Sequence, residues 1–462
     1  MFVVRFARRL RQSLGPLWWY SALLFAVSRL GDVVNLYIGA FLVPDLVPTA
    51  DLGAVRPLMR VAELVAMPLV FLVLPAEKFL NVFAERRETG KARALVRDLL
   101  LLTAALLAAL ALAGGIANGP LLERLHLSGP AHAGILPLLL LLTAGACLRP
   151  IAQAAARSFK LFNSVVLAGL PDPFVRLVLM LVLLRAMSPL RGFVVAQGLS
   201  GLAGTAVLMA AVALFFRRER VRCESYRAHL REMADYAAPL LLYTLATTFQ
   251  DPVEDFLIRQ RLTEDASAAA YILKTLAMIP QYFGGAVAMF LFPLVSSAYE
   301  QRRETRRYLW QSMCVTGLLG LGCCALLTAW GDFAISLRPA WSVACDFPGL
   351  IGWLSLGIAF RVVVNCFVLH EHACRRFRYL RFFLPMQFLQ TGGLFILMGW
   401  GAFRNILPSP LWELVAAWPR ETLRFVILWG AAWQGATLAA VVAFAAAEQK
   451  ALQHTPQKHT NP

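Results

Sequence analysis

Charged side chains interrupt two apolar segments near the N-terminus at the spacing of a helical face. Residues three and four apart lie on the same side of a helix, so each segment presents one polar stripe. The first stripe contains Arg29, Asp32 and Asn35, and the second contains Arg56, Arg60 and Glu63. A charge at the centre of a bilayer costs about 2.5–3.5 kcal/mol on insertion scales, so each requires a partner or a function.

The arginines in these stripes suit the recognition of phosphate. A guanidinium is planar, stays charged, and donates two parallel hydrogen bonds to two phosphate oxygens. If the stripes line a water-filled central cavity, Arg29 and Arg60 are the residues expected to bind a diphosphate head group. The alternative is structural, because Arg29 with Asp32, and Arg60 with Glu63, also form ion pairs within one helix that hide charge in a bundle.

A second polar group follows between residues 247 and 281. Asp251, Glu254 and Asp255 lie within five residues, and like charges this close disfavour joint ionisation. We interpret them as a coupling-ion site for H+ or Na+, or as a gate that pairs with the arginines; if they face outer water, they need no special role. Lys274 and Gln281, seven residues apart, are predicted to line the cavity.

Three further patterns allow weaker interpretations. Leu170-Pro-Asp-Pro173 is expected to break a helix, and the break either lines a cavity or only separates two helices. Arg149 and Arg361 are interpreted as anchors at the membrane interface. His370 and His372 lie two residues apart on a predicted helix and therefore point to different sides, so no metal site is expected.

The elements that position these residues are membrane-spanning helices. The chain has 462 residues, of which 59% are hydrophobic and 15% charged, against about 45–50% and about 25% in soluble domains. This composition excludes a water-soluble enzyme, a disordered protein and a disulfide-rich secreted domain. About twelve stretches reach the roughly 20 apolar residues of a spanning helix: 16–43, 53–84, 98–118, 132–156, 161–186, 191–216, 236–258, 268–298, 308–330, 346–370, 380–400 and 421–447.

The net charge of +17 is distributed unevenly among the loops. In a soluble chain it would suggest nucleic acid, but in this chain the basic residues follow the membrane topology. With the N-terminus in the cytoplasm, about 27 Lys and Arg fall in cytoplasmic segments and about 7 in the opposite loops. The sequence therefore predicts a multi-pass membrane protein with both termini in the cytoplasm, and no nucleic-acid partner.

An internal repeat divides the chain into halves. Glu85-Arg-Arg-Glu-Thr89 recurs as Gln301-Arg-Arg-Glu-Thr305, and Ala66-Met-Pro68 matches Met278-Ile-Pro280. Matches in the same order and at similar offsets predict two six-helix lobes, residues 1–232 and 233–462, related by a pseudo-twofold axis along the membrane normal. The expected fold class is therefore an all-α polytopic membrane protein of about twelve helices in two bundles.

At this level the chain resembles the oligosaccharide flippase (polysaccharide transporter) family, within the superfamily of multidrug, oligosaccharidyl-lipid and polysaccharide exporters. The clearest stretch runs from Ala270-Tyr-Ile-Leu-Lys-Thr-Leu-Ala-Met-Ile-Pro280 through Leu291-Phe-Pro-Leu-Val-Ser-Ser297 to the Arg-Arg-Glu-Thr loop. The resemblance implies two six-helix bundles around a central cavity and export of a lipid-linked sugar by alternating access.

These observations predict a flippase that moves a polyprenyl-diphosphate-linked oligosaccharide across the inner membrane, driven by an ion gradient. The expected partners are that substrate, membrane lipids, H+ or Na+, and a glycan polymerase and glycosyltransferases; no cofactor is expected. A cation-coupled multidrug exporter is the alternative within transport. A membrane enzyme acting on the same lipid is less favoured, because the long loop 401–421 holds few candidate catalytic groups.

Overall fold

The chain is almost entirely helical and divides into two compact units. The computed structural model describes residues 26–27, 29–125, 127, 132, 134–219, 222–374, 376–398 and 419–454. These residues contain no strand. Contacts group the chain into unit 1, Met1–Ile272, and unit 2, Leu273–Pro462. The division into lobes at residue 232, expected from the repeat, stays a prediction.

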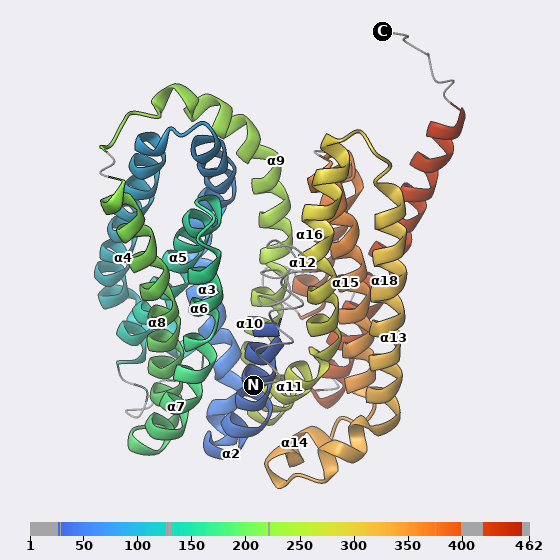
Figure 1. The fold of residues 1–462 in the computed structure, drawn as a ribbon. Helices are drawn as coiled ribbons and strands as arrows, with labels where there is room; N and C mark the ends of the chain where they lie inside the picture. Colours follow the sequence, from blue (N-terminus) through green and yellow to red (C-terminus); the bar gives the residue numbers. More distant parts are fainter. Residues whose placement is uncertain are drawn as a thin grey trace, which may run out of the picture. The chain divides into compact units, whose positions relative to one another are not determined.

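Unit 1 is built around α5, which contacts α3, α4 and α8 (Figure 1). Residues 29–37 are helical and run directly into the π-helical turn η1. The elements of unit 1 are η1 (Ile38–Leu42), α2 (Val43–Leu46), α3 (Thr49–Glu85), α4 (Thr89–Arg124), α5 (Ile135–Ser158), α6 (Phe162–Gly169), α7 (Pro171–Ala186), α8 (Pro189–Arg218), η3 (Arg227–His229), α9 (Leu230–Thr248) and α10 (Gln250–Arg261). Helix α11 (Glu264–Ala277) crosses into unit 2.

Unit 2 is centred on α15, which contacts α12, α13 and α18; these run from yellow to red in Figure 1. Its elements are α12 (Ile279–Glu300), α13 (Arg306–Ser336), η4 (Pro339–Trp341), α14 (Ser342–Cys345), α15 (Leu350–Ala373), α16 (Leu380–Leu397) and α18 (Pro419–His454).

Eight helices in the described parts of the chain are long and apolar enough to cross a membrane. They are Thr49–Glu85, Thr89–Leu112, Ile135–Ser158, Asn163–Ala186, Pro189–Arg218, Arg306–Ser336, Leu350–Ala373 and Leu423–Glu448. The start of the first predicted span, and the loop 401–421 apart from its last residues in α18, lie outside the described residues. The predicted all-α polytopic architecture is confirmed.

Prolines divide three of the predicted spans into shorter helices. The expected break at Leu170-Pro-Asp-Pro173 is present, since α6 ends at Gly169 and α7 begins at Pro171. Two breaks were not expected: residues 236–258 divide between α9 and α10, and residues 268–298 divide between α11 and α12. Pro252 and Pro280 follow these breaks, and a proline has no N–H to bond the carbonyl four residues earlier. A new helix therefore begins at each of these points.

Three helices end on a basic residue in the left-handed conformation. Arg87, Lys160 and Arg302 have φ angles of 58°, 57° and 55°. In each case the amide of the next residue donates a hydrogen bond to the carbonyl five residues earlier, with an N···O distance of 2.8 Å. The three bonds run from Glu88 to Phe83, from Leu161 to Ala156 and from Arg303 to Ala298. This is the Schellman arrangement, in which glycine is usual. Both copies of the repeated Arg-Arg-Glu-Thr loop thus form the same turn, although one residue out of register.

Replacing Arg87 with glycine should stabilise unit 1. A left-handed non-glycine residue costs about 1–2 kcal/mol, partly offset by the greater freedom of glycine in the unfolded chain. We expect Arg87→Gly to raise the free energy of unfolding by about 0.5–1 kcal/mol, measured by thermal unfolding in detergent. The matched control is Arg86→Gly, because Arg86 has a right-handed helical φ of −78°. Equal stabilisation by both variants would contradict this account.

Candidate functional site

One guanidinium in unit 1 is surrounded by three carboxylates. Arg60 on α3 donates from Nη1 to Glu63 Oε2 at 2.5 Å and from Nε to Asp255 Oδ2 at 3.2 Å, and its Nη2 lies 3.5 Å from Asp251 Oδ2. We refer to these four residues as the Arg60 cluster. Glu63 is on the same helix, whereas both aspartates come from α10. The cluster brings together two residues of the second predicted stripe, Arg60 and Glu63, and two residues of the predicted gate.

The helix break before α10 places the aspartates against α3. Helix α9 ends at Thr248, and α10 starts at Gln250 and contacts α3. Asp251 and Asp255 are four residues apart and therefore share the face of α10 that meets Arg60. Twelve residues after Asp255, on α11, Ser267 Oγ donates to the Gly53 carbonyl at 3.2 Å, and a Cβ on Gly53 would approach Ser267 Oγ to 2.6 Å. Close approach at this glycine thus keeps α11 beside α3.

The Arg60 cluster carries a formal charge of −2, with one arginine against three carboxylates. Asp255 is 4% exposed, Arg60 21%, Asp251 35% and Glu63 42%. All three nitrogens of the Arg60 fork thus face a carboxylate, but two of those carboxylates remain open to solvent. Such an arrangement can exchange one anion for another, because a phosphate offers the fork the same acceptor geometry.

Arg56, one turn before Arg60, is partnered differently. Its guanidinium lies 5.6 Å from the ring centroid of Tyr271 on α11, a cation–π contact. The second arginine of the stripe is therefore held on an aromatic face.

A second ionic cluster lies deeper among α5, α7 and α8. Asp172, 5% exposed, binds the guanidinium of Arg149, and its Oδ1 accepts from Arg176 Nη2 at 2.6 Å. Arg176 also donates to Asn35 Oδ1 at 2.8 Å and to Ser200 Oγ at 3.2 Å. We refer to these five residues as the Asp172 cluster. It ties the helical residues before η1 to α5, α7 and α8.

The remaining predicted residues of unit 1 differ in their partners and exposure. Arg29 Nη2 lies 2.9 Å from Asp32 Oδ2, and both side chains are 26% exposed. The intrahelical pairs Arg29–Asp32 and Arg60–Glu63 are thus both present. Asn35, the third residue of the first stripe, accepts a hydrogen bond from Arg176 and so belongs to the Asp172 cluster. Glu254 is half-buried on α10.

Lys274 and Gln281 belong to unit 2. Lys274 is half-buried on α11, and Gln281 is exposed near the start of α12. Their role in a cavity stays a prediction.

The Asp172 cluster is the feature that sequence reasoning missed. The sequence contained one signal for it, because Arg176 follows Asp172 by one helical turn beside two prolines. Arg149 was interpreted as an interface anchor, but its guanidinium pairs with Asp172, 23 residues away along the chain. No local spacing connects these two residues, since helices α5 and α7 meet only in the folded unit.

No metal centre is found among the described residues, where no group of three or more His, Cys, Asp and Glu side chains is arranged to hold an ion. The histidines at the end of α15 make separate contacts. His370 bonds Glu371 Oε1 at 3.0 Å and Thr305 Oγ1 at 3.2 Å, whereas His372 Nε2 lies 2.7 Å from the Tyr379 hydroxyl.

Comparison with protein families gives one match. Residues 161–338 match the family described as polysaccharide biosynthesis protein. The matched segment includes α7, with Asp172 and Arg176, and α10, with the two aspartates that bind Arg60. No match was found among curated protein sequences.

Solved structures with a similar fold are transporters. An inward-facing MATE family multidrug resistance transporter of the MOP superfamily aligns with a TM-score of 0.65 and 14% identity, covering 94% of this chain and 99% of that chain. An outward-facing MATE transporter gives 0.61 and 16%, covering 96% and 99%. A MOP superfamily transporter from Pyrococcus furiosus, described by a reverse polarity of its binding pocket that suggests a different function, gives 0.59 and 15%, covering 95% and 97%. The predicted two-lobed helical fold is confirmed.

Replacing Asp172 with asparagine should destabilise unit 1 strongly. The variant leaves two guanidinium groups together without their shared carboxylate, and breaking a buried pair costs about 3–5 kcal/mol. Thermal unfolding in detergent measures the loss.

Asp32→Asn is the matched control for Asp172→Asn. Asp32 is 26% exposed and pairs with an arginine of its own helix, so its loss should cost at most about 1 kcal/mol. An equal loss for both variants would show that the Asp172 cluster is no more important to stability than a half-exposed pair.

Proposed function

We propose that this chain is an exporter of the MOP superfamily and, within it, a flippase for a polyprenyl-diphosphate-linked oligosaccharide in the bacterial inner membrane. The family match over residues 161–338 supports a role in polysaccharide biosynthesis. The observation that carries the proposal is the Arg60 cluster, in which a guanidinium fork inside a span is bound by carboxylates that a diphosphate can replace.

In the proposed mechanism, Arg60 alternates between internal and substrate anions. In the structure its fork is occupied by Glu63, Asp251 and Asp255. A substrate diphosphate carries more charge than one carboxylate and presents paired oxygens, so it competes for the same donors. Binding of substrate then frees α10 from α3, and this release of a helix is the element on which alternating access depends.

Protonation of a carboxylate would favour the same release. Asp255, the most buried acid of the Arg60 cluster, loses its charge and its ion pair when it binds a proton. A proton entering from outside therefore weakens the contact between α10 and α3 and makes Arg60 available for a diphosphate. We propose Asp255 as the primary coupling residue, with Asp251 and Glu254 as secondary carboxylates that can bind H+ or Na+.

The other predicted residues complete the proposed cavity. Arg29 is the second diphosphate ligand, held until then by Asp32. Arg56, half-buried beside the ring of Tyr271, is proposed as a further cationic contact to the substrate. Asn35, Lys274 and Gln281 are proposed as polar contacts to the oligosaccharide. Glycosyltransferases that make the substrate and a polymerase that consumes it are the proposed partners.

A multidrug exporter is the alternative, because the Arg60 cluster has a net charge of −2. Three acids around one base would also attract a cationic drug if Arg60 served only to hold them in place. The two proposals predict opposite roles for Arg60. Export of a diphosphate-linked substrate requires Arg60, whereas export of a cationic drug does not.

Replacing Arg60 with alanine should abolish export of surface glycan while the protein still accumulates in the membrane. Arg60→Lys should retain less than about a tenth of the activity, because an ammonium lacks the two-pronged geometry. The measurement is surface glycan in a strain that depends on this protein, and Arg86→Ala in the exposed loop is the control. Full export of surface glycan by Arg60→Ala would contradict the flippase proposal. Retained export of a cationic dye by the same variant would favour the multidrug exporter.

Replacing Asp255 with asparagine should separate coupling from binding. In vesicles, we expect the native protein to flip lipid-linked sugar faster when a proton gradient is imposed, and Asp255→Asn to lose that acceleration. Asp251→Asn, at a 35% exposed position, should lose only part of it. Gradient-dependent flipping that survives in Asp255→Asn would move the coupling site elsewhere.

A further inference from the structure

A cavity of about 550 Å³ opens between the ends of α4 and α8 in unit 1. Three arginines line it: Arg93 and Arg97 from the start of α4, and Arg217 from the end of α8. All three are exposed. The rest of the wall is apolar and includes Leu100, Val212 and Phe216, and none of its described residues is acidic.

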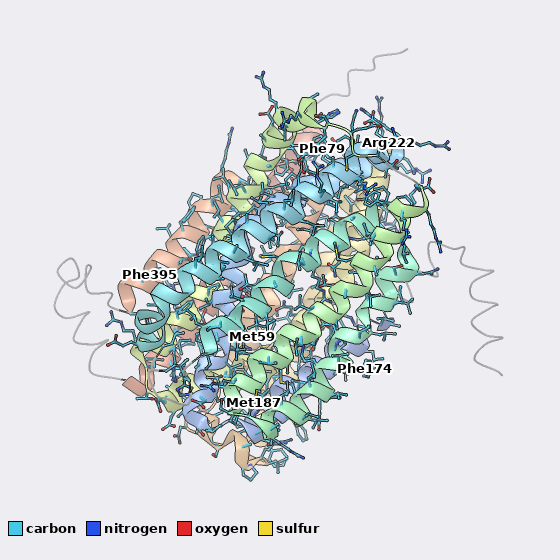
Figure 2. The ribbon with its side chains drawn as sticks, turned by 90° about the vertical axis from the view of Figure 1, so that its left-hand side faces the viewer. Met59, Phe79, Phe174, Met187, Arg222 and Phe395 are labelled. Atoms are coloured by element: carbon cyan, nitrogen blue, oxygen red, sulfur yellow. The ribbon has the colours of Figure 1, made fainter. Side chains whose placement is uncertain are left out.

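This cavity lies at the membrane boundary. The candidate spans Thr89–Leu112 and Pro189–Arg218 both have their charged ends here. In Figure 2 the labelled Phe79 of α3 and Arg222, just beyond α8, lie at this end, while Met187 marks the opposite end of the helices. The arginines are therefore at the level of lipid head groups, and the apolar wall continues into the hydrocarbon region.

One of the three arginines has a carboxylate partner next to the cavity. Arg97 donates from Nε and Nη2 to Asp98 Oδ1 at 2.9 and 2.8 Å. The second oxygen of Asp98 accepts from the Tyr226 hydroxyl at 3.1 Å. Asp98 thus offsets one of the three cations and connects the cavity to the segment between α8 and α9. Burial, together with the hydrogen bond to Asp98, raises the pKa of Tyr226, so this hydroxyl stays a donor.

We propose that this cavity binds an anionic glycerophospholipid of the membrane, with its phosphate on the three arginines and an acyl chain along the apolar wall. A basic pocket between the ends of spanning helices has the charge and position for such a head group. A free phosphate would satisfy the arginines but leave the apolar wall without a partner. A neutral lipid would fill the wall but would bring no net negative charge to the three arginines. This site is separate from the Arg60 cluster and does not depend on the proposed substrate.

A lipid in this place would stabilise the connection between α8 and α9. Residues 222–226 return to the start of α4, where the Glu224 amide donates to the Gly90 carbonyl at 3.1 Å. A Cβ on Gly90 would come within 2.7 Å of the Arg222 carbonyl oxygen, so this segment lies in close contact with the start of α4. The bound phosphate would fix the ends of α4 and α8 on which this connection rests.

The test compares lipids and variants of the purified full-length protein in detergent. Phosphatidylglycerol should raise the melting temperature and remain bound in native mass spectrometry, whereas phosphatidylcholine and inorganic phosphate should do neither. Because each basic residue near a lipid surface contributes about 1 kcal/mol, Arg93→Gln or Arg217→Gln should weaken phosphatidylglycerol binding about fivefold. Their combination should weaken it about twenty-five-fold.

Arg218→Gln is the matched control, because Arg218 is an exposed neighbour at the same helix end but does not line the cavity. It should bind phosphatidylglycerol like the native protein. Equal weakening by Arg218→Gln would show that surface charge alone attracts the lipid, and would overturn the proposal. Stabilisation by inorganic phosphate that matches phosphatidylglycerol, or no retained lipid at all, would overturn it as well.

Discussion

The need to neutralise arginine inside a membrane span determines how the helices of unit 1 are arranged. An unpaired guanidinium at this depth is costly, and pairing it with a carboxylate from the same helix offsets only part of that cost. Arg60 draws Asp255 from α10, and Asp172 draws Arg149 from α5. Each of these contacts joins residues of different helices and so fixes where two helices meet. Hydrophobic matching cannot do this in lipid, because lipid tails are as apolar as the side chains.

Interrupted helices make these ion pairs possible. The interruption at Phe249 divides residues 236–258, so the three acids all lie on the short helix α10, which contacts α3. The break between α6 and α7 similarly places Asp172 in the first turn of α7, where the helix dipole favours a carboxylate. Prolines near both breaks leave backbone carbonyls without their usual donors, and such positions in membranes are tolerated where protein or a water-filled cavity surrounds them. The same residues therefore orient the charges and form the polar surroundings those charges need.

The sequence was sufficient for the fold class and for some of the site, and the limits have physical causes. Apolar length predicted the long spans, and helical spacing predicted that Arg29 pairs with Asp32 and Arg60 with Glu63. The spacing of residues along one helix does not show which other helix packs against it. The contact of Arg149 with Asp172 could therefore not be derived from the sequence. The contact of Arg60 with Asp255, 195 residues apart, was accessible only as a general idea that carboxylates meet the arginines. The breaks at Phe249 and Met278 were missed, although Pro252 and Pro280 follow them in the sequence.

The basic residues of this chain divide into two populations with different physics. Arg60 and Arg176 lie inside spans, at 21% and 13% exposure, and their carboxylate partners define them. Arg93 and Arg217 lie at the ends of spans and are exposed in the wall of the cavity between α4 and α8. In the first population some carboxylate partners come from another helix, as Asp255 does for Arg60, so exchange of such a partner is proposed to move a helix. In the second population the proposed partner is an anionic lipid, which would contribute to local order and not to transport. Most of the basic residues behind the net charge of +17 are predicted to lie in loops, and the proposed transport chemistry depends on the few charges inside the spans.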